Sequence, residues 1–398
     1  MTTKNLKHAA LALLLAAGFY ACHKEDKPEE PDDGICKITM TVKGLIINGK
    51  LCSRSVYIGG TDSATIDWGD GTPVQSIELI SDRYYDHTFP DSSVVYTVKI
   101  KGKNITDLVT WNLGVMITLD ISKNPALKKL TCSNDLKNLD ISKNIALEQL
   151  DCSLNLLTSL DVSNNPALTY LSCSRCRLTS LTLNKELMGL SCDNNQLTSL
   201  DVSENTALTS LGCRGNQLTN LDVSECATLT ELYCNENQLT NLDVSKNTAL
   251  AELYCNENQL TNLDISKNTA LTHLQCGINR ITSLDISKNT ALIYLGCSYN
   301  QLTSLDVSNN TALRSSHCNH NKLTNLVVSK DTPLSELQCR NNELSSETLN
   351  DLFNMLRTKT VDDVNSPSLS ISCNPGTEGC DKSIAENKGW QINIYCAK

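Results

Sequence analysis

The stretch LTNLDVSKNTALAELYCNENQ, residues 239–259, is followed directly by its near copy LTNLDISKNTALTHLQCGINR, residues 260–280. One cysteine marks the register of each copy, and the series runs Cys132, Cys152, Cys173, Cys192, Cys213, Cys234, Cys255, Cys276, Cys297, Cys318 and Cys339. The spacings are 20, 21 and 19 residues and then 21 residues seven times, so the period is 21 residues. A fixed period of this length predicts a solenoid of stacked coils.

Each copy contains the same pattern twice. Leu-x-x-Leu-x-apolar-x-x-Asn occurs at 239–247 and again at 250–258. In the second occurrence Leu and Cys alternate with a variable residue, which predicts a short strand with Leu and Cys on one side. No copy can bury its leucines alone, but parallel strands stacked about 4.8 Å apart build one continuous core.

This double pattern resembles the leucine-rich repeat family, specifically its nested 21-residue class, with Cys where most members have Leu. The resemblance covers more than half of the chain. It implies a solenoid with parallel strands along one face, and we expect these repeats over 106–342.

A series of asparagines follows the cysteines. Its members are Asn155, Asn195, Asn216, Asn237, Asn258, Asn279, Asn300, Asn321 and Asn342. A side-chain amide at a tight turn can pair with buried backbone groups that a regular sheet does not reach. Asp135 and Cys176 interrupt this series, and Cys226 replaces Asn in the other half of its copy.

Thirteen of the nineteen cysteines follow the repeat, because Cys176 and Cys226 occupy Asn positions and eleven mark the register. We expect these thirteen to be buried, reduced thiols. A disulfide between in-register neighbours would strain the sheet. A single recurring Cys also lacks the paired C-x-x-C spacing of zinc sites.

Residues 1–21 are predicted to be a signal peptide, because Lys4 and Lys7 precede an apolar run that is too short to span a bilayer. Ala21 before Cys22 resembles the bacterial lipoprotein box, which implies lipid attachment at Cys22. Residues 22–34 are acidic and contain two prolines, so we expect an extended tether. The acidic run also resembles surface-export signals of some Gram-negative lipoproteins; a plain solvated spacer is the alternative.

Alternation with a period of two predicts strands within 35–105, as in KITMTVKG and YTVKIKG. WGDG at 68–71 and DHTF at 86–89 lie between these strands. Together they resemble the PKD family, an immunoglobulin-like sandwich of extracellular proteins. The resemblance implies a buried Trp68, a turn with positive φ, and structural roles for Asp70 and His87. The sequence leaves open whether Cys36 and Cys52 are bonded.

A capping unit is expected over 343–398. Ser345 is placed to cap a helix with apolar residues at i, i+3, i+4 and i+7. Strands at 369–372 and 391–395 and a short helix around 381–387 follow. The sequence leaves open whether a pair among Cys373, Cys380 and Cys396 is bonded, and it favours Cys380 as the partner in such a pair.

The expected fold class is therefore mixed and β-dominated. It consists of an N-terminal immunoglobulin-like β-sandwich, a leucine-rich-repeat solenoid and a C-terminal α/β cap. Covering the end of a solenoid is required because the last coil would otherwise expose its core.

Composition excludes two classes of function. The net charge is −10 at pH 7 and supplies no basic face, so we expect no nucleic-acid partner. Neither G-x-S-x-G nor H-E-x-x-H occurs, and no carboxylate pair stands apart from a repeating aspartate row. We therefore expect neither an enzyme nor a cofactor.

The aspartate row consists of Asp120, Asp140, Asp161, Asp201, Asp222, Asp243, Asp264, Asp285 and Asp306. Stacked carboxylates repel one another, and nearby lysines, bound Ca²⁺ or hydrogen bonds could offset that repulsion. We favour hydrogen bonds to Ser, Thr and backbone, because the Gly-rich turns of calcium solenoids are absent. His317, Cys318 and His320 are not expected to bind a metal, since Cys318 points into the core.

The residues before each strand Leu and each Cys point away from the core and form the candidate binding surface. Its later coils collect aromatic and acidic side chains, and we predict the ligand-binding residues Tyr233, Tyr254, His273, Tyr294, Tyr299, His317, Glu231 and Glu252. The alternative is that neighbouring tyrosines such as Tyr233 and Tyr254 only cover each other.

These features predict a monomeric protein of the bacterial cell envelope. A lipid at Cys22 would anchor it to the membrane, at the outer-membrane surface, and secretion is the alternative location. The strand face would bind an extracellular protein in adhesion or recognition. A glycan-binding lipoprotein and a spacer without a specific ligand are the alternative functions.

Overall fold

A computed structural model of the protein describes residues 35–394 except 45, 48–49, 52, 80–82, 111–114, 134 and 361–365. The predicted signal peptide, the lipid site at Cys22 and the acidic tether lie outside the described residues. Cys52 of the candidate Cys36–Cys52 pair also lies outside them. Within the described part of the chain, no helix combines the length and apolar character needed to cross a bilayer.

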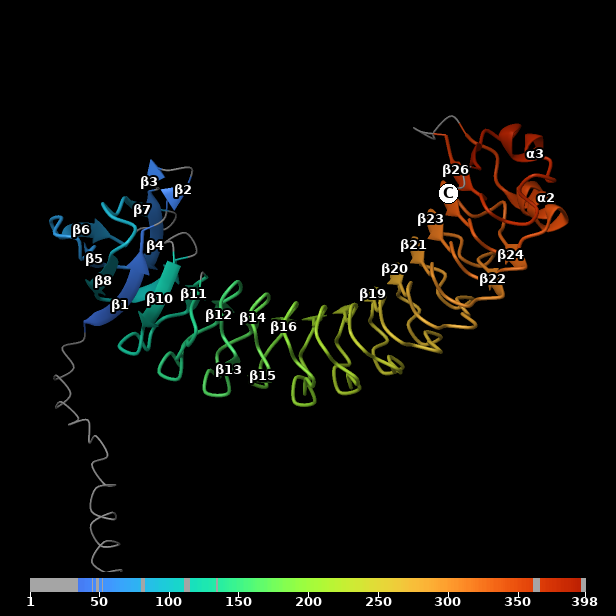
Figure 1. Ribbon diagram of the computed structural model, residues 1–398. Coiled ribbons are helices and arrows are strands. Elements are labelled where there is room, and N and C mark those ends of the chain that lie inside the picture. The colour runs from blue at the N-terminus through green and yellow to red at the C-terminus, as the bar shows by residue number, and fades with distance from the viewer. Residues whose placement is uncertain are drawn as a thin grey trace, which may run out of the picture. The chain divides into compact units, whose positions relative to one another are not determined.

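The repeats build one long parallel sheet to which each coil adds a three-residue strand (Figure 1). The strands are β11 (Lys129–Thr131), β12 (Gln149–Asp151), β14 (Tyr170–Ser172), β16 (Gly189–Ser191), β17 (Ser210–Gly212), β18 (Glu231–Tyr233), β19 (Glu252–Tyr254), β20 (His273–Gln275), β21 (Tyr294–Gly296), β23 (Ser315–His317) and β25 (Glu336–Gln338). Neighbours pair in register, as Leu232, Leu253 and Leu274 do. The predicted stack of coils is confirmed.

Leucine and cysteine fill the interior, as predicted. Cys234, Cys255 and Cys276 follow adjacent parallel strands and are 0% exposed. All eleven register cysteines, together with Cys176 and Cys226, are buried free thiols. Burial raises the pKa of the Cys234 thiol to about 12, so the reactive thiolate is scarce at neutral pH.

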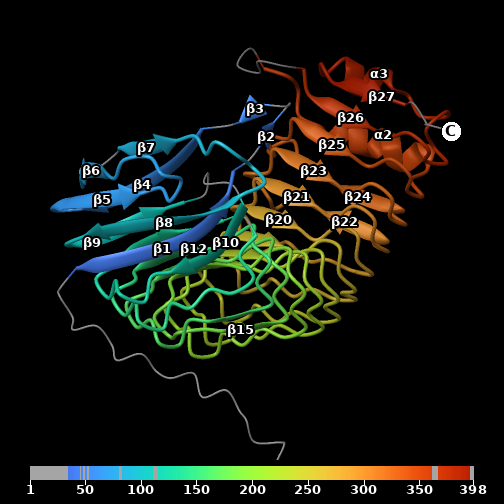
Figure 2. The same cartoon turned by 60° about the vertical axis from the view of Figure 1, so that its left-hand side comes forward.

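The other half of each coil closes the core from the opposite side (Figure 2). Its leucine and its valine or isoleucine are buried, as Leu263 and Ile265 are. Two pairs of these segments form short parallel sheets, β13 (Ser159–Asp161) with β15 (Ser180–Thr182) and β22 (Ser304–Asp306) with β24 (Asn325–Val327).

The predicted asparagine series links adjacent coils. Asn258 Nδ2 donates to the carbonyl oxygens of Cys234 and Cys255 at 3.0 and 3.1 Å, and its Oδ1 accepts the N–H of Leu239 at 2.9 Å. One amide therefore pairs three backbone groups of two coils. Cys176 takes over part of this role, since its Sγ lies 3.3 Å from the carbonyl oxygen of Cys152.

A second asparagine series runs along the opposite side of the core. Asn268, which is 0% exposed, donates to the carbonyl oxygens of Val244 and Asn247 at 2.9 and 2.8 Å. The series consists of Asn124, Asn144, Asn165, Asn184, Asn205, Asn247, Asn268, Asn289 and Asn310. Cys226 occupies one position of this series, with its Sγ 3.6 Å from the carbonyl oxygen of Val202.

The N-terminal strands form an antiparallel sheet and also extend the long one. The antiparallel sheet has the order β10 (Val115–Asp120), β1 (Cys36–Lys43), β8 (Val95–Gly102), β5 (Ser63–Asp67) and β6 (Gln75–Glu78). The long sheet continues through β9 (Ile105–Val109), β4 (Arg54–Gly60) and β7 (Tyr84–His87), and β2 (Ile46–Ile47) pairs with β3 (Lys50–Leu51). The PKD-like assignment and the domain boundaries stay predictions.

The turn around Trp68 has the features expected of it. Trp68 is buried and stacks on His87 with ring centroids 4.6 Å apart. His87 Nε2 lies 2.7 Å from Asp70 Oδ2, so these two side chains hold the turn together. Gly69 has φ 74°, and a Cβ there would lie 2.3 Å from the Thr97 carbonyl oxygen. Only glycine fits this position.

One strand belongs both to the N-terminal part and to the repeats. β9 pairs antiparallel with β4 and parallel with β11. Thr110 follows β9, is buried, and occupies the position that cysteine takes in later coils. Its N–H donates to the Thr131 carbonyl at 2.8 Å, as the Cys132 N–H donates to that of Asp151 at 2.8 Å. The predicted boundary between 105 and 106 therefore falls inside a strand.

The C-terminal segment continues the long sheet and adds two helices. α2 (Ser346–Met355) begins after Ser345, whose side chain accepts the N–H of Thr348 as expected. β26 (Ser368–Ser370) and β27 (Gln391–Asn393) extend the sheet, and α3 (Ser383–Glu386) lies between them in sequence. Lys388 Nζ donates to the carbonyl oxygens of Phe353 and Leu356 at the end of α2.

The predicted role of Cys380 as a disulfide partner is wrong. Cys380 is a buried free thiol, whereas Cys373 is disulfide-bonded. Cys380 is instead held in the core, where its Sγ lies 3.4 Å from the Thr377 carbonyl oxygen.

Replacing Asn258 with Ala should destabilise the solenoid by about 2–4 kcal/mol, because three buried backbone groups lose their partner. Replacing it with Cys should cost about half as much, since Cys176 shows that a thiol can reach the same kind of carbonyl. Thermal unfolding followed by circular dichroism measures both. Equal losses for the two variants would contradict this role of the amide.

Candidate functional site

The outward side chains of the long sheet form two parallel rows, which we call the strand face. One row contains Glu231, Glu252 and His273, in register across β18, β19 and β20. The other contains Tyr233 and Tyr254. All five are half-buried, because neighbours one strand apart cover part of each other. The predicted residues therefore lie together on one surface.

Tyr233, Tyr254 and Glu252 contact one another. The two tyrosine rings lie 5.1 Å apart, tilted by 39°, and Tyr233 Oη donates to Glu252 Oε2 at 2.7 Å. Burial and this hydrogen bond raise the pKa of Tyr233 well above its usual value. The tyrosines do cover each other, as the alternative interpretation held, and both rings and Glu252 remain partly exposed to solvent.

A second cluster lies on the strands that follow, from β20 to β25. His273 stacks on Tyr294 with centroids 6.4 Å apart, and Tyr294 Oη lies 3.1 Å from His317 Nδ1. Glu336 Oε2 is 3.2 Å from His317 Nε2 and accepts from Ser315 Oγ at 2.9 Å. Burial raises the pKa of Glu336, but hydrogen bonds from Gln338, His317 and Ser315 outweigh it and hold that pKa below its usual value.

Ser315, His317 and Glu336 are not arranged as a nucleophile relay. Both Ser315 Oγ and Glu336 Oε2 approach Nε2 of His317, at 3.2 Å each. A relay requires the acid on the opposite ring nitrogen, where it would orient the base. Tyr294 occupies that side, so the cluster is suited to hydrogen bonding with a ligand.

A cavity of about 200 Å³ adjoins this cluster and is lined by Tyr294, His317, Tyr299 and Ile278 among others. Ile278 and Tyr299 are 50% and 49% exposed, with φ of 53° and 58°. The same turn position has left-handed φ in every coil from Leu154 to Asn341, so this conformation belongs to the repeat, and Ile278 is its β-branched member. Ile278 was not among the predicted residues, although it departs from the charged residues Glu236 and Glu257 at the equivalent position of the preceding coils.

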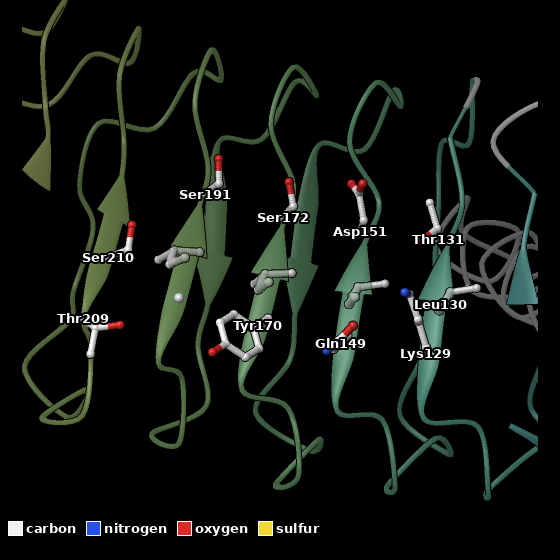
Figure 3. A pocket seen from close by; sticks show the side chains of 14 residues that line it. Lys129, Leu130, Thr131, Gln149, Asp151, Tyr170, Ser172, Ser191, Thr209 and Ser210 are labelled. Atoms are coloured by element: carbon white, nitrogen blue, oxygen red, sulfur yellow. The ribbon is translucent and has the colours of Figure 1, made fainter. Parts of the chain in front are cut away.

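A larger groove lies over the earlier coils, from β11 to β17 (Figure 3). Its volume is about 400 Å³. The early rows are visibly small and polar in the sequence, but residues such as Ser172, Gly189 and Ser191 do not reveal a groove when taken one at a time. Their shortness leaves the space, and Tyr170 lies within it with 50% of its surface exposed.

The aspartate row forms hydrogen-bonded turns, as favoured. At each aspartate of the row, Oδ1 accepts the N–H of the Ser two residues later, as in Asp264 and Ser266 at 2.9 Å. These hydrogen bonds lower the pKa of Asp264 and of its counterparts Asp140, Asp201, Asp222, Asp243 and Asp285. Among the described residues, no three His, Cys, Asp or Glu side chains gather where a metal could bind.

Acid should unfold the wild-type protein partly through this row. The folded pKa of these carboxyls lies below their ordinary value of 3.8, so their contribution is complete above that pH. It is lost as pH falls through the lowered values. Replacing Asp243, Asp264 and Asp285 with Asn should lower the thermal midpoint at pH 7 and flatten its decline below about pH 4, so that the variant and the wild type converge at low pH.

Thermal midpoints measured from pH 7 to pH 2 test this expectation. A matched control replaces the exposed acids Glu186, Glu204 and Glu225 with Gln. An Asn variant whose midpoint declines as steeply as wild type would show that the row does not contribute.

Comparison with known proteins identifies similar folds. No family model and no curated protein matches the chain. Among solved structures, the functional domain of InlJ from Listeria monocytogenes, described as including a cysteine ladder, is 32% identical, with 67% of this chain and 69% of that chain covered and a TM-score of 0.56.

Two further structures share the fold at lower identity. A leucine-rich repeat protein from Leptospira interrogans is 23% identical, covering 71% of this chain and 82% of its own, with a TM-score of 0.56. An internalin, InlF, from Listeria monocytogenes is 19% identical, covering 74% and 88%, with a TM-score of 0.53.

Proposed function

This chain belongs to the leucine-rich repeat family, and we propose that it binds an extracellular protein through the later coils of the strand face. The observation that carries the proposal is the aromatic cluster around the cavity between β20 and β23. There Tyr294 and His317 are hydrogen-bonded to each other, and the exposed side chains of Ile278 and Tyr299 line the same cavity.

The chemistry of this region suits a protein partner. Aromatic side chains and histidine supply rigid contact area, and Ile278 adds an exposed apolar side chain. Glu231 and Glu252 lie beside the tyrosines and provide a polar rim. The hydrogen bonds within the cluster fix the rotamers before binding, which reduces the entropy that association would cost.

Anchoring at the bacterial surface is part of the same proposal. A lipid on Cys22 and the acidic segment 22–34 would display the strand face outside the outer membrane, in adhesion or recognition. The support for this is the leader, the small residue before Cys22 and the acidic composition that follows. A spacer without a ligand is the competing function, and the exposed aromatic and apolar side chains beside the cavity argue against it.

Joint replacement of Tyr233, Tyr254 and Tyr294 with Ser should weaken partner binding by about thirtyfold or more, because each ring is a candidate anchor. The measurement is binding of the full chain to an array of purified host and bacterial surface proteins. Tyr84→Ser, at a 49% exposed tyrosine of β7, is the matched control. Silence across the array favours the spacer, and unchanged binding by the triple variant moves the partner off this face.

Mass spectrometry of the mature protein from a Gram-negative host tests the anchor. We expect an N-terminal Cys22 carrying acyl chains and partition of the protein into detergent. Cys22→Ala should abolish both. An unmodified N-terminus at any other residue would show that the protein is secreted without an anchor.

A further inference from the structure

The groove over β11 to β17 is separate from the proposed protein-binding region, which begins at β18. Its volume of about 400 Å³ lies within the range of about 300–1,000 Å³ common for small-ligand sites. Nothing in the proposed function uses it. Its lining differs from that of the later coils in having a single aromatic side chain, Tyr170.

Tyr170 lies in the groove because its neighbour on the next strand is glycine. Tyr170 and Gly189 are paired in register on β14 and β16. A Cβ on Gly189 would lie 2.9 Å from Tyr170 Cδ1 and 3.2 Å from Cε1. The absence of that atom lets the phenol ring lie against the backbone of β16, where half of its surface remains exposed. The ring is therefore a platform.

The polar side chains around this platform are neutral with two exceptions. Figure 3 shows Thr131, Asp151, Ser172 and Ser191 along one side, and Lys129, Gln149 and Tyr170 along the other. The groove thus offers hydroxyl, amide and carboxylate groups, with one cation that is balanced by one carboxylate.

Several of these hydroxyl groups are fixed in place. Ser172 Oγ is 2.8 Å from Ser153 Oγ, and Ser191 Oγ is 2.8 Å from Ser174 Oγ and donates to Asp193 at 3.1 Å. Asp151 Oδ1 accepts the Ser153 N–H at 3.0 Å. Hydrogen-bonding groups held in this way lose little freedom when they bind a ligand.

A sugar ring matches this arrangement. One face of a pyranose consists of C–H groups, which pack on an aromatic ring, and its edge carries hydroxyls that both donate and accept. A protein segment would need further apolar anchors, yet the leucines of the groove, such as Leu150 and Leu190, are buried. An anionic ligand would meet a single cation, Lys129, among the lining residues.

We propose that this groove binds a neutral pyranose, such as the terminal residue of a surface glycan, stacked on Tyr170. The strand face then carries two sites of different chemistry. The sugar site does not depend on the protein partner proposed above.

Saturation-transfer NMR on the full chain tests the site with methyl β-glucoside, methyl β-galactoside, methyl α-mannoside and N-acetylglucosamine. At least one of these should receive magnetisation, most strongly on the C–H protons of one ring face. N-acetylneuraminic acid, an anionic sugar, should receive less. In titrations, Tyr170→Ala should weaken the affinity about tenfold, the equivalent of about 1.4 kcal/mol.

Two variants separate a local effect from a folding defect. Gly189→Ala keeps the tyrosine but fills the space beside its ring, so it should also weaken binding. Tyr84→Ala removes a tyrosine of β7 that is 49% exposed and lies outside the groove, so it should leave sugar affinity unchanged. Its melting midpoint is the reference for that of Tyr170→Ala. Transfer to none of the neutral sugars, stronger binding of the anionic sugar, or full affinity in Tyr170→Ala would each overturn the proposal.

Discussion

The structure depends on one hydrogen-bonding arrangement, a buried amide that joins the backbone of two coils. Each strand of the coils from β11 to β25 has only three residues, so sheet hydrogen bonds alone would leave the turns between strands unpaired. Asn258 and its counterparts pair those turn groups, and the second series around Asn268 does the same on the opposite side. Leucine and cysteine supply the apolar burial, and asparagine satisfies the polar groups that this burial encloses.

A constant interior leaves the outward positions free to vary. Tyr254, Gln275 and Gly296 occupy equivalent positions on three neighbouring strands. They give the surface different chemistry and leave the leucine row intact. The same scaffold can therefore carry a groove where the residues are small and an aromatic cluster where they are large. Function in this protein is a property of side chains that contribute little to the fold.

The regular parts of the molecule were predictable and the exceptions were not. Periodicity located the strands, the cysteine row and the hydrogen-bonded aspartates, because each copy repeats the same physical solution. Thr110 escaped prediction because it fills a cysteine position without being cysteine, and this hid the coil that contains β9. Cys380 was misjudged because sequence spacing does not measure the distance between sulfur atoms. Ile278 and the groove were missed because each depends on residues of the adjacent coil, which lie about 21 positions away in the sequence.

Because the coils stack in register, the solenoid also fixes the distances between surface features along its sheet. Adjacent strands in a sheet lie about 4.8 Å apart, so the separation between the Tyr170 groove and the Tyr294 cluster is a whole number of such steps. Gain or loss of one 21-residue copy between them would move one recognition element relative to the other by one strand spacing. The chemistry of each site would stay the same. The two sites together would then fit a target whose two binding features have a different spacing.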